Sequence, residues 1–416
     1  MHFFLTNTLI YTVFPLIVQT KCFDVLYQTA IATMFDTVPM VNATINPFLN
    51  APAQIVRLRL LNGSSDRSYM FGFSNNMNFH LIATDGGLIT TPLQLNRIRL
   101  SPGERAEVLV DFSTMQGQTI SFMNYGSEIP NGIMGALTVG NGMAQIPDYN
   151  LNPLNGADFN LLQIIVGPPT ANPVTTIPSA LTILSPWNTL SANRTRTITF
   201  APKNMGMQDM VEGPFTMNGN QFSMDTINDT TYLNHIEIWT LNNQTLVAHP
   251  FHIHDVQFFI TDENGSPPPA YEAGKKDVVL VMPQQTVSFI TKFENYADDT
   301  IPYMYHCHLL HHEDDGMMGS FVVLDSTALS INDTKQEVSS YYPNPVTGDK
   351  LNIELSAFNG SIQFKIINTM GHLVLTGNSK VNDNRLSLNT KGLIPGLYYI
   401  ILISKNTNST LKVVVE

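Results

Sequence analysis

Histidine is concentrated in two short segments of this chain, and this distribution constrains the fold more than any other feature. Seven of the eleven histidines lie in residues 249–254 (HPFHIH) and 306–312 (HCHLLHH). Within each segment imidazoles recur two residues apart, which on a β-strand places them on one face. We therefore expect two strands that bring these side chains together, because scattered core histidines would not cluster in this way.

The rest of the chain has the pattern of an all-β protein. Helical periodicity is scarce, and short strand-like runs recur between Gly, Pro and Asn residues, as in β-sandwiches. The charged fraction is 13%, and the chain contains 26 Gly and 25 Pro, which suits a protein rich in strands and turns. The clearest runs are residues 56–61, 107–112, 237–241 and 257–261.

The length predicts more than one domain. At about 150 residues per domain, 416 residues correspond to two to four domains. Polar stretches at residues 146–156 and 325–340 are the candidate boundaries. We predict four parts, with all the metal-type residues in the second: residues 1–150, residues 151–326, a linker at 327–340 and a small strand-rich domain at 341–416.

Charge and cysteine content exclude some classes of protein. The net charge is −12 and there is no basic block, so the chain is a poor binder of nucleic acid. Two distant cysteines, Cys22 and Cys307, exclude a disulfide framework. No stretch beyond the N-terminus reaches the ~18 apolar residues that a membrane-spanning helix needs.

The apolar N-terminal stretch, residues 1–20, has two interpretations. It resembles a signal peptide in hydrophobicity, but it lacks a basic start and a small-x-small cleavage site, and Thr, Asn and Pro interrupt its apolar region. We favour the second interpretation, in which residues 14–19 form the first strand of a folded domain.

The second histidine segment carries ligands for a soft metal. If it is a strand, His306 and His308 share one face and Cys307 lies on the other. After Cys307 the spacing C-x4-H-x4-M gives His312 and Met317, and it favours Met317 over the adjacent methionine. Two imidazoles, a thiolate and a weak axial thioether form the blue-copper set, with His249 available as the second imidazole.

The opposite face predicts a second, nitrogen-only metal site. His252 and His254 would converge there with His306 and His308. Zinc is the competing metal for these segments, but it usually occupies closed, cysteine-rich tetrahedral sites, and the chain has no C-x2-C motif. A zinc site would also leave the C-x4-H-x4-M spacing unexplained, so we favour copper.

These motifs resemble a known family. HPFHIH, followed about fifty residues later by HCHLLHHEDDGMM, is similar to the C-terminal copper signature of the multicopper oxidases, closest to their bacterial laccase, cuprous oxidase and bilirubin oxidase branch. Residues 59–64 (RLLNGS), 85–87 (DGG) and 102–111 (PGERAEVLVD) resemble the family's middle domain. The resemblance covers roughly residues 12–325 and implies two cupredoxin-like Greek-key β-sandwiches.

The resemblance also implies a copper cofactor, a set of ligands and a reaction. The type 1 ligands would be His249, Cys307, His312 and Met317; His252 would hold the type 2 copper; and His254, His306 and His308 would hold the type 3 pair. A phenolic, tetrapyrrole or cuprous donor would give electrons on the side of His249 and His312. Electrons would leave through Cys307 to His306 and His308, and reduce dioxygen at the trinuclear site.

The chain encodes half of the ligands that this site uses in the family. The family's trinuclear cluster draws on four H-x-H motifs, two of them from an N-terminal cupredoxin domain, whereas this sequence contains only HIH and HCH. Three explanations remain open: a fragment or late start codon of a longer oxidase, assembly with a separately encoded first domain, or a protein that binds copper without reducing oxygen. We favour the first.

Several further residues have two interpretations. Glu313 resembles the family's acid near the proton route to oxygen, but it also suits a surface turn in EDDG. His311 is expected to face away from His312, toward solvent or behind the ligands. A methionine-rich stretch offers thioethers for Cu(I), although methionine also fills irregular cores: Met205, Met207, Met210, Met217 and Met224.

The last block is predicted to be a small sandwich without catalytic chemistry. Its strand-like runs are residues 351–355, 362–367, 372–375, 397–404 and 411–415. YPNP at residues 342–345 and GLYYI at 396–400 resemble the C-terminal sorting domain of type IX secretion, which implies that secretion machinery carries the protein to the exterior or the outer-membrane surface after periplasmic transit. A generic Ig-like binding module is the alternative.

The sequence thus predicts a secreted copper-dependent oxidoreductase that uses dioxygen. A non-catalytic type 1 copper or electron-transfer protein is the main alternative. A structural surface protein on a cupredoxin scaffold is less favoured, because intact soft ligands would serve no purpose there.

Overall fold

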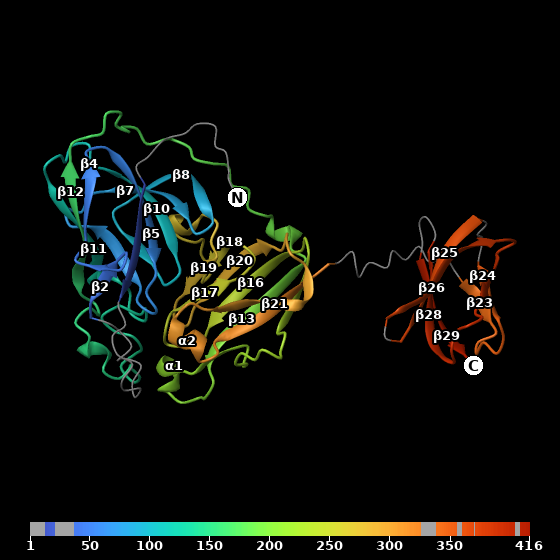
Figure 1. The fold of residues 1–416 in the computed structure, drawn as a ribbon. Coiled ribbons are helices and arrows are strands. Elements are labelled where there is room, and N and C mark those ends of the chain that lie inside the picture. Colours follow the sequence, from blue (N-terminus) through green and yellow to red (C-terminus); the bar gives the residue numbers. More distant parts are fainter. Residues whose placement is uncertain (1–12, 21–36, 326–337, 356–359, 370, 404–407) are drawn as a thin grey trace. The chain divides into compact units, whose positions relative to one another are not determined.

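The computed structural model of the chain describes residues 13–20, 37–325, 338–355, 360–369, 371–403 and 408–416. Cys22 lies outside these residues. The chain divides into two compact units, residues 1–324 and 325–416 (Figure 1). Almost all regular structure is β, as the sequence predicts. The short helices are η2 (Gly126–Glu128), η3 (Tyr149–Leu151), η4 (Thr189–Ser191), α1 (Asp209–Glu212), η5 (Ala270–Glu272) and α2 (Leu310–Asp314).

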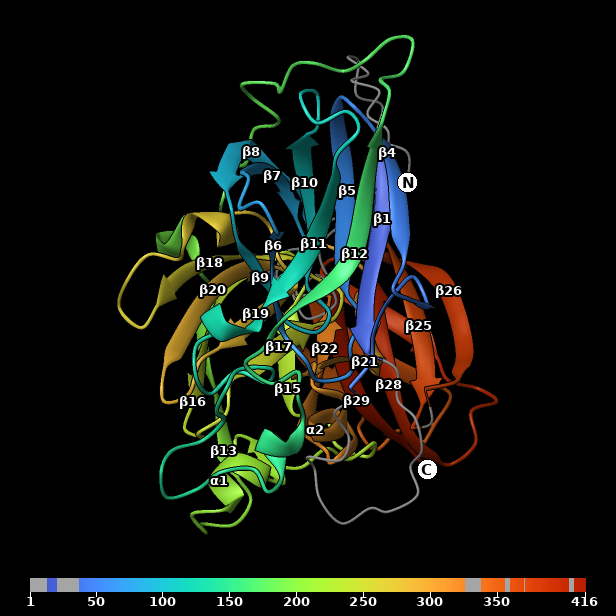
Figure 2. The same cartoon turned by 90° about the vertical axis from the view of Figure 1, so that its left-hand side faces the viewer.

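The first unit begins with a sandwich of two sheets. One sheet contains, in spatial order, β3 (Thr44–Ile45), β2 (Pro39–Val41), β1 (Val13–Thr20), β5 (Ile55–Asn62), β10 (Arg105–Asp111), β7 (Phe79–Thr84) and β8 (Gly87–Leu95). The facing sheet contains β4 (Phe48–Pro52), β12 (Asp158–Gly167), β11 (Thr119–Tyr125), β6 (Tyr69–Phe73) and β9 (Ile98–Leu100) (Figure 2). Strand β1 confirms the strand interpretation of residues 14–19.

Side-chain alternation explains why β5 forms. Val56, Leu58 and Leu60 are buried, while the intervening arginines lie on the other face. Arg57 Nε donates to Glu107 of the neighbouring β10 at 2.6 Å, and Arg59 Nε lies 3.0 Å from the same carboxylate. The polar face of the strand is therefore paired, and its apolar face enters the core.

The first sandwich continues beyond residue 150, where the sequence predicts a boundary. Strand β12 pairs with β11 and, in parallel, with β4. The polar stretch at 146–156 is a loop rather than a linker, because Ile146 and Tyr149 are buried in the core of the second sandwich before the chain returns to the first. We therefore propose a domain boundary after Gly167.

The second sandwich repeats this strand order without counterparts of β3 and β8. One sheet contains β14 (Phe215–Met217), β13 (Arg194–Pro202), β16 (Ile236–Asn243), β20 (Thr286–Lys292) and β18 (Phe258–Glu263). The other contains β15 (Asp229–Tyr232), β22 (Met318–Leu324), β21 (Asp298–Cys307), β17 (His249–Ile253) and β19 (Val278–Val281). In both sandwiches one strand pair of each sheet is parallel: β1–β5, β4–β12, β13–β16 and β15–β22.

The C-terminal unit is a smaller sandwich with its own core. One sheet contains β23 (Val338–Tyr342), β24 (Lys350–Leu355) and β27 (Arg385–Asn389). The other contains β26 (Leu373–Val381), β25 (Gly360–Asn368), β28 (Gly396–Ile403) and β29 (Asn408–Val415). The strands confirm the runs that the sequence predicts here. Leu351, Ile353, Ile362 and Ile366 are fully buried between the sheets.

Buried ion pairs join the two sandwiches of the first unit. Lys276 Nζ, from the second sandwich, lies 2.8 Å from Glu104 Oε1 and 3.2 Å from Asp85 Oδ2 of the first. Arg99 Nη2 of β9 lies 3.2 Å from Glu272 Oε1 of η5. These carboxylates favour the charged ammonium, and the pKa of Lys276 is raised although its burial alone would lower it.

We expect Glu263, beside Glu272, to make stability depend on pH. Burial, and then the Glu272 carboxylate, raise the pKa of Glu263 to about 7. The folded state holds this proton more tightly than the unfolded chain does. The stability that protonated Glu263 contributes is therefore present below about pH 4.5 and is lost as the pH rises through 7. Glu263→Gln should therefore stabilise the protein by about 1 kcal/mol more at pH 8 than at pH 5, after allowance for its partial exposure.

Thermal unfolding at the two pH values measures this difference. The surface variant Glu294→Gln is the matched control, and it should keep the pH dependence of the wild type. Equal effects of Glu263→Gln at both pH values would contradict the interpretation.

Candidate metal centres

The two histidine segments form neighbouring antiparallel strands, as the sequence predicts. Strand β17 pairs with β21 so that Phe251 lies opposite Cys307 and His252 opposite His306. Because side chains alternate along each strand, Cys307 faces the buried core together with Phe251, whereas His252 and His306 face the other way. This register separates the candidate ligands into two sets.

On the buried face, one thiol and two imidazoles converge. Cys307 Sγ lies 3.6 Å from His249 Nδ1 and 3.5 Å from His312 Nδ1, and the two nitrogens are 3.1 Å apart. His312 reaches this point from α2, the short helix that follows β21. All three side chains are buried.

Burial keeps these three groups neutral when no metal is present. It lowers the pKa of His249 to about 3, and it lowers the pKa of His312 as well. It also raises the pKa of the Cys307 thiol, although the Leu309 backbone N–H that donates to Sγ opposes this shift. Neutral imidazoles present free lone pairs, and a bound cation would favour the thiolate, so this donor set fits a soft metal ion.

Neighbouring groups fix the orientation of these ligands. Thr245 Oγ1 lies 2.8 Å from His249 Nε2, which leaves Nδ1 to face the sulfur. The Phe215 ring packs edge-on against both imidazoles, at centroid distances of 4.8 and 4.6 Å. Met317 is fully buried in the same core, and its backbone bonds to both Cys307 and His312.

The opposite face carries the second set of imidazoles. His252, His254 and His306 each offer a ring nitrogen, and these atoms lie within 4.8 Å of one another. The ring of His308 is 5.8 Å from that of His252 and 5.6 Å from that of His306. The structure thus brings together all four histidines that the sequence assigned to a nitrogen-only site.

Backbone carbonyls and one carboxylate orient this imidazole cluster. His252 Nδ1 lies 2.8 Å from the Asp277 carbonyl oxygen, and His306 Nδ1 lies 3.0 Å from the Cys307 carbonyl oxygen. Glu313 Oε2 is 3.2 Å from His306 Nδ1, so this side chain faces the cluster. Its location beside an imidazole favours the chemical interpretation of Glu313 over that of a simple surface turn.

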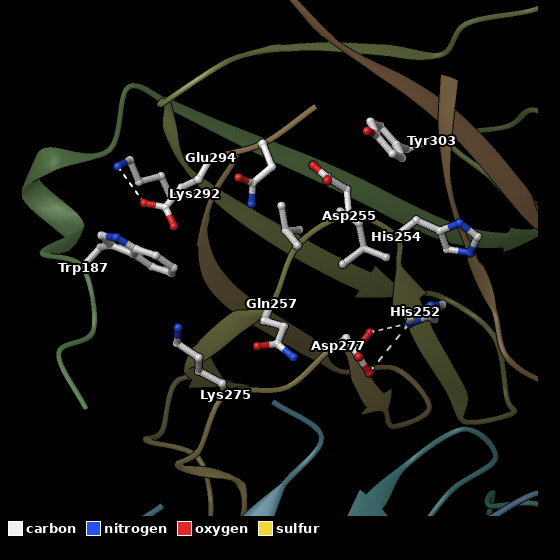
Figure 3. A pocket seen from close by; sticks show the side chains of 13 residues that line it. Trp187, His252, His254, Asp255, Gln257, Lys275, Asp277, Lys292, Glu294 and Tyr303 are labelled. Carbon is white, nitrogen blue, oxygen red and sulfur yellow. Dashed lines mark hydrogen bonds and ion pairs between the residues drawn. The ribbon is translucent and has the colours of Figure 1, made fainter. Parts of the chain in front are cut away.

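An open cleft of about 630 Å³ borders the imidazole cluster. His252 and His254 line one end, and Trp187 with Lys275 lies toward the other (Figure 3). His254 is partly exposed there, in contrast to the buried thiol face. Solvent therefore reaches the cluster, and a small molecule has room beside it.

His311 does not lie in solvent, so that part of the expectation was wrong. It is 6% exposed, and its Nδ1 lies 2.5 Å from Asp66 Oδ1 of the first sandwich. Its ring is 4.1 Å from that of His312. Asp66 lies 245 residues earlier in the chain, so no local sequence pattern predicts that it pairs with His311.

The first sandwich has no such metal set at the equivalent strands. Strands β6 and β11 occupy the positions of β17 and β21 in the shared topology. There Phe71 pairs with Asn124, and Gly72 with Met123, where the second sandwich has Phe251 with Cys307 and His252 with His306. The positions of Cys307, His252 and His306 are thus taken in the first sandwich by Asn124, Gly72 and Met123.

Comparisons with known proteins agree with this geometry. Sequence profiles of multicopper oxidases match residues 33–135 and 191–327. The structure of a laccase-like multicopper oxidase, CueO from Ochrobactrum sp., is 30% identical with a TM-score of 0.63, over 76% of this chain and 67% of that one. The chain belongs to the multicopper oxidase family.

Curated relatives of this multicopper oxidase include proteins with different names. The multicopper oxidase Mco of Staphylococcus haemolyticus is 33% identical over 297 residues, which are 70% of this chain and 53% of the relative. The cell division protein FtsP of Dickeya dadantii is 30% identical over 315 residues, or 74% and 60% of the two chains. The chain spans about half the length of the Mco proteins it matches. Membership in this family implies copper binding.

The C-terminal unit has a separate assignment. A profile of secretion-system C-terminal sorting domains matches residues 340–416, which indicates secretion or display at the cell surface. Among the described residues, no helix has the length and hydrophobicity to cross a membrane.

The methionine-rich stretch of this multicopper oxidase contains both exposed and buried side chains. Met205 and Met224 are 93% and 80% exposed, whereas Met217 is buried in the core. The Leu246 N–H donates to the Met210 carbonyl, so the stretch lies close in space to the strand that carries His249.

We expect Thr245 to support copper binding at the thiol face. Thr245→Val removes the hydroxyl beside His249 Nε2, and removal of such a supporting group typically weakens metal binding about tenfold or more. Titration with Cu(II), followed by the absorbance of the copper–thiolate, measures this site alone. Thr245→Ser keeps the hydroxyl and should bind as the wild type does; equal weakening in both variants would show that the hydroxyl has no such role.

Proposed function

We propose that this chain is a copper-dependent oxidoreductase in which His249, Cys307, His312 and Met317 would hold a type 1 copper. The observation that carries the proposal is the convergence of the Cys307 sulfur with two imidazole nitrogens at 3.5 and 3.6 Å in a buried pocket. A thiolate with two imidazoles selects copper over harder cations. Copper held there would supply one-electron redox chemistry between a donor and dioxygen.

We assign the imidazole cluster to the oxygen-reducing site. His252 would hold the type 2 ion, and His254, His306 and His308 would contribute to the type 3 pair. In this proposal four further imidazoles, from outside the sequence printed here, complete the trinuclear set; an N-terminal cupredoxin domain is the expected source. The cleft beside His252 and His254 supports the assignment, because it gives a small oxidant and solvent access to these nitrogens.

The backbone of β21 links the two sets of ligands. Cys307 is covalently bonded to His306 and His308, and its carbonyl oxygen accepts a hydrogen bond at 3.0 Å from His306 Nδ1. This short connection supports electron transfer from the thiol face to the imidazole face, with no other side chain in between.

Glu313 is the proposed proton-holding group. Its carboxyl oxygen lies 3.2 Å from His306 Nδ1, and burial raises its pKa, so it retains a proton more readily than an exposed glutamate. We propose that it delivers protons at Oε2 while oxygen is reduced at the adjacent cluster.

The proposed donors are phenolic, tetrapyrrole or cuprous compounds, which would give electrons on the side of His249 and His312. The Ochrobactrum enzyme is described as active toward lignin model compounds, which supports a phenolic donor. The exposed thioethers of Met205 and Met207, in the stretch whose Met210 carbonyl bonds to Leu246, support a cuprous one. Secretion by the type IX route, through the sorting domain, would place this chemistry outside the cell.

The experiment that tests the type 1 assignment is copper loading of the full chain. Wild-type protein should become blue, because a copper–thiolate site absorbs strongly in the visible range. Cys307→Ser should lose this colour completely while the imidazole cluster still binds copper. Serine at this buried site is small, so folding is checked by the melting temperature of the metal-free variant. A colourless copper-loaded wild type would contradict the proposal.

A second candidate is a copper protein that transfers electrons or binds copper without reducing oxygen. One relative is named as a cell division protein rather than as an oxidase, and this similarity supports the second candidate. Oxygen uptake with a phenolic donor separates the two. Blue protein that consumes no oxygen, even with a domain supplying two H-x-H motifs, would support the second candidate; uptake that depends on Cys307 would support the oxidase.

A further inference from the structure

Three consecutive residues of one turn in the first sandwich contact His308 and the segment that orients His252. Gly103, Glu104 and Arg105 connect β9 to β10, within the motif PGERAEVLVD. No ligand belongs to this turn, and the proposed function does not explain why the motif is there. Besides hydrogen bonds within the first sandwich, its residues contact the second sandwich next to His252 and His308.

Arg105 reaches His252 through Asp277. Its guanidinium binds the Asp277 carboxylate with both nitrogens, Nη1 to Oδ1 at 2.5 Å and Nη2 to Oδ2 at 2.7 Å. The carbonyl oxygen of the same Asp277 lies 2.8 Å from His252 Nδ1 and accepts the Ile253 backbone N–H at 3.3 Å. A bidentate pair fixes the orientation of a carboxylate, and here it fixes the residue whose carbonyl orients an imidazole. Figure 3 shows Asp277 beside His252.

Glu104 and Asp85 hold the residue before Asp277. Glu104 Oε1 lies 2.8 Å from Lys276 Nζ, and Asp85 Oδ2 lies 3.2 Å from the same atom. The Gly86 N–H and the Thr84 hydroxyl both donate to the Lys275 carbonyl, at 2.7 and 2.8 Å. Residues 275–277 of the second sandwich are thus attached to the first by side chains and backbone.

Gly103 supports the other side of the cluster. A Cβ at this position would lie 2.4 Å from His308 Cδ2 and 2.5 Å from its Nε2, so only glycine allows the turn to approach the ring. Its φ of +82° also favours glycine. The turn therefore limits the space available to His308 while Arg105 acts on His252.

We propose that the turn at residues 102–105 is a positioning element for the imidazole cluster, with Arg105 fixing His252 through Asp277 and Gly103 limiting His308. The first sandwich then has a part in the metal site although it supplies no ligand. The proposal rests on the proposed function only in treating the cluster as a metal site. The tautomer of His252 in metal-free protein tests the positioning without that assumption.

The chain offers a matched control for this role. Arg99 makes another buried ion pair between the sandwiches, with Glu272 at 3.2 Å, and the structure shows no bond from it to the segment that carries Asp277. Arg99→Met and Arg105→Met each remove one such pair. If Arg105 only stabilises the contact between the sandwiches, the two variants should have the same effect on the cluster.

The first measurement is the pair of His252 ring-nitrogen chemical shifts, by NMR on metal-free full-length protein. The wild type and Arg99→Met should show a proton held on Nδ1, as the bond to the Asp277 carbonyl requires. Arg105→Met should show a mixture of tautomers. A His252 spectrum that is unchanged in Arg105→Met would overturn the proposal.

The second measurement is the affinity of the cluster for Cu(II), by calorimetry in a Cys307→Ser background that removes the thiol site. Loss of outer groups that orient metal ligands weakens binding by about 10–100-fold, and we expect this for Arg105→Met and Gly103→Ala. Arg105→Lys, which keeps the charge but loses the bidentate geometry, should be intermediate. Equal weakening in Arg99→Met would overturn the proposal, because it would show a general effect of loosening the contact.

The two hypotheses fail in different ways. Absence of Cu(II) binding in every variant would contradict the proposed function but leave the NMR test of positioning intact. Melting temperatures of all variants show whether each one is folded.

Discussion

The register of β17 on β21 is the constraint on which the metal centres depend. Phe251 opposite Cys307 and His252 opposite His306 place one thiol in the core and the imidazole cluster on the other face. A slip of one residue would exchange the two faces, burying imidazoles in an apolar core and exposing the thiol. Because the two faces differ so strongly in polarity, the hydrophobic core of the second sandwich fixes the register and, with it, the separation of soft and nitrogen-only ligands.

The first sandwich shows what this fold does without ligands. Its equivalent strands have Asn124, Gly72 and Met123 at the positions of Cys307, His252 and His306. Its contribution comes instead through the contact between the sandwiches, where Asp66 meets His311 and the turn at 102–105 meets the supports of His252 and His308. In our proposals, one copy of the topology supplies the metal ligands and the other orients them.

Local sequence predicted the strands and the convergence of the candidate ligands, because both rest on short-range patterns. Alternation in VRLRLL predicts the buried face of β5, and the spacing in HIH and HCH predicts the imidazole cluster. The boundary at residue 150 disagrees with the sheet order, because β12 returns to the first sandwich after Tyr149 enters the core of the second. Of the two predicted places for His311, solvent was wrong and a place behind the ligands agrees with the structure; Asp66, its partner, lies far away in the sequence. The roles of Thr245 and Arg105 were missed for related reasons: a hydroxyl in a turn and an arginine on a strand carry no sign of their partners.

The most direct test of the central claim is the coordination of copper at the thiol face, measured by X-ray absorption on protein loaded with one copper per chain. If His249, Cys307 and His312 hold copper, the wild type should show one short copper–sulfur bond and two copper–nitrogen bonds, and Cys307→Ser should show no short copper–sulfur bond. A copper environment of nitrogen and oxygen alone in the wild type would contradict it.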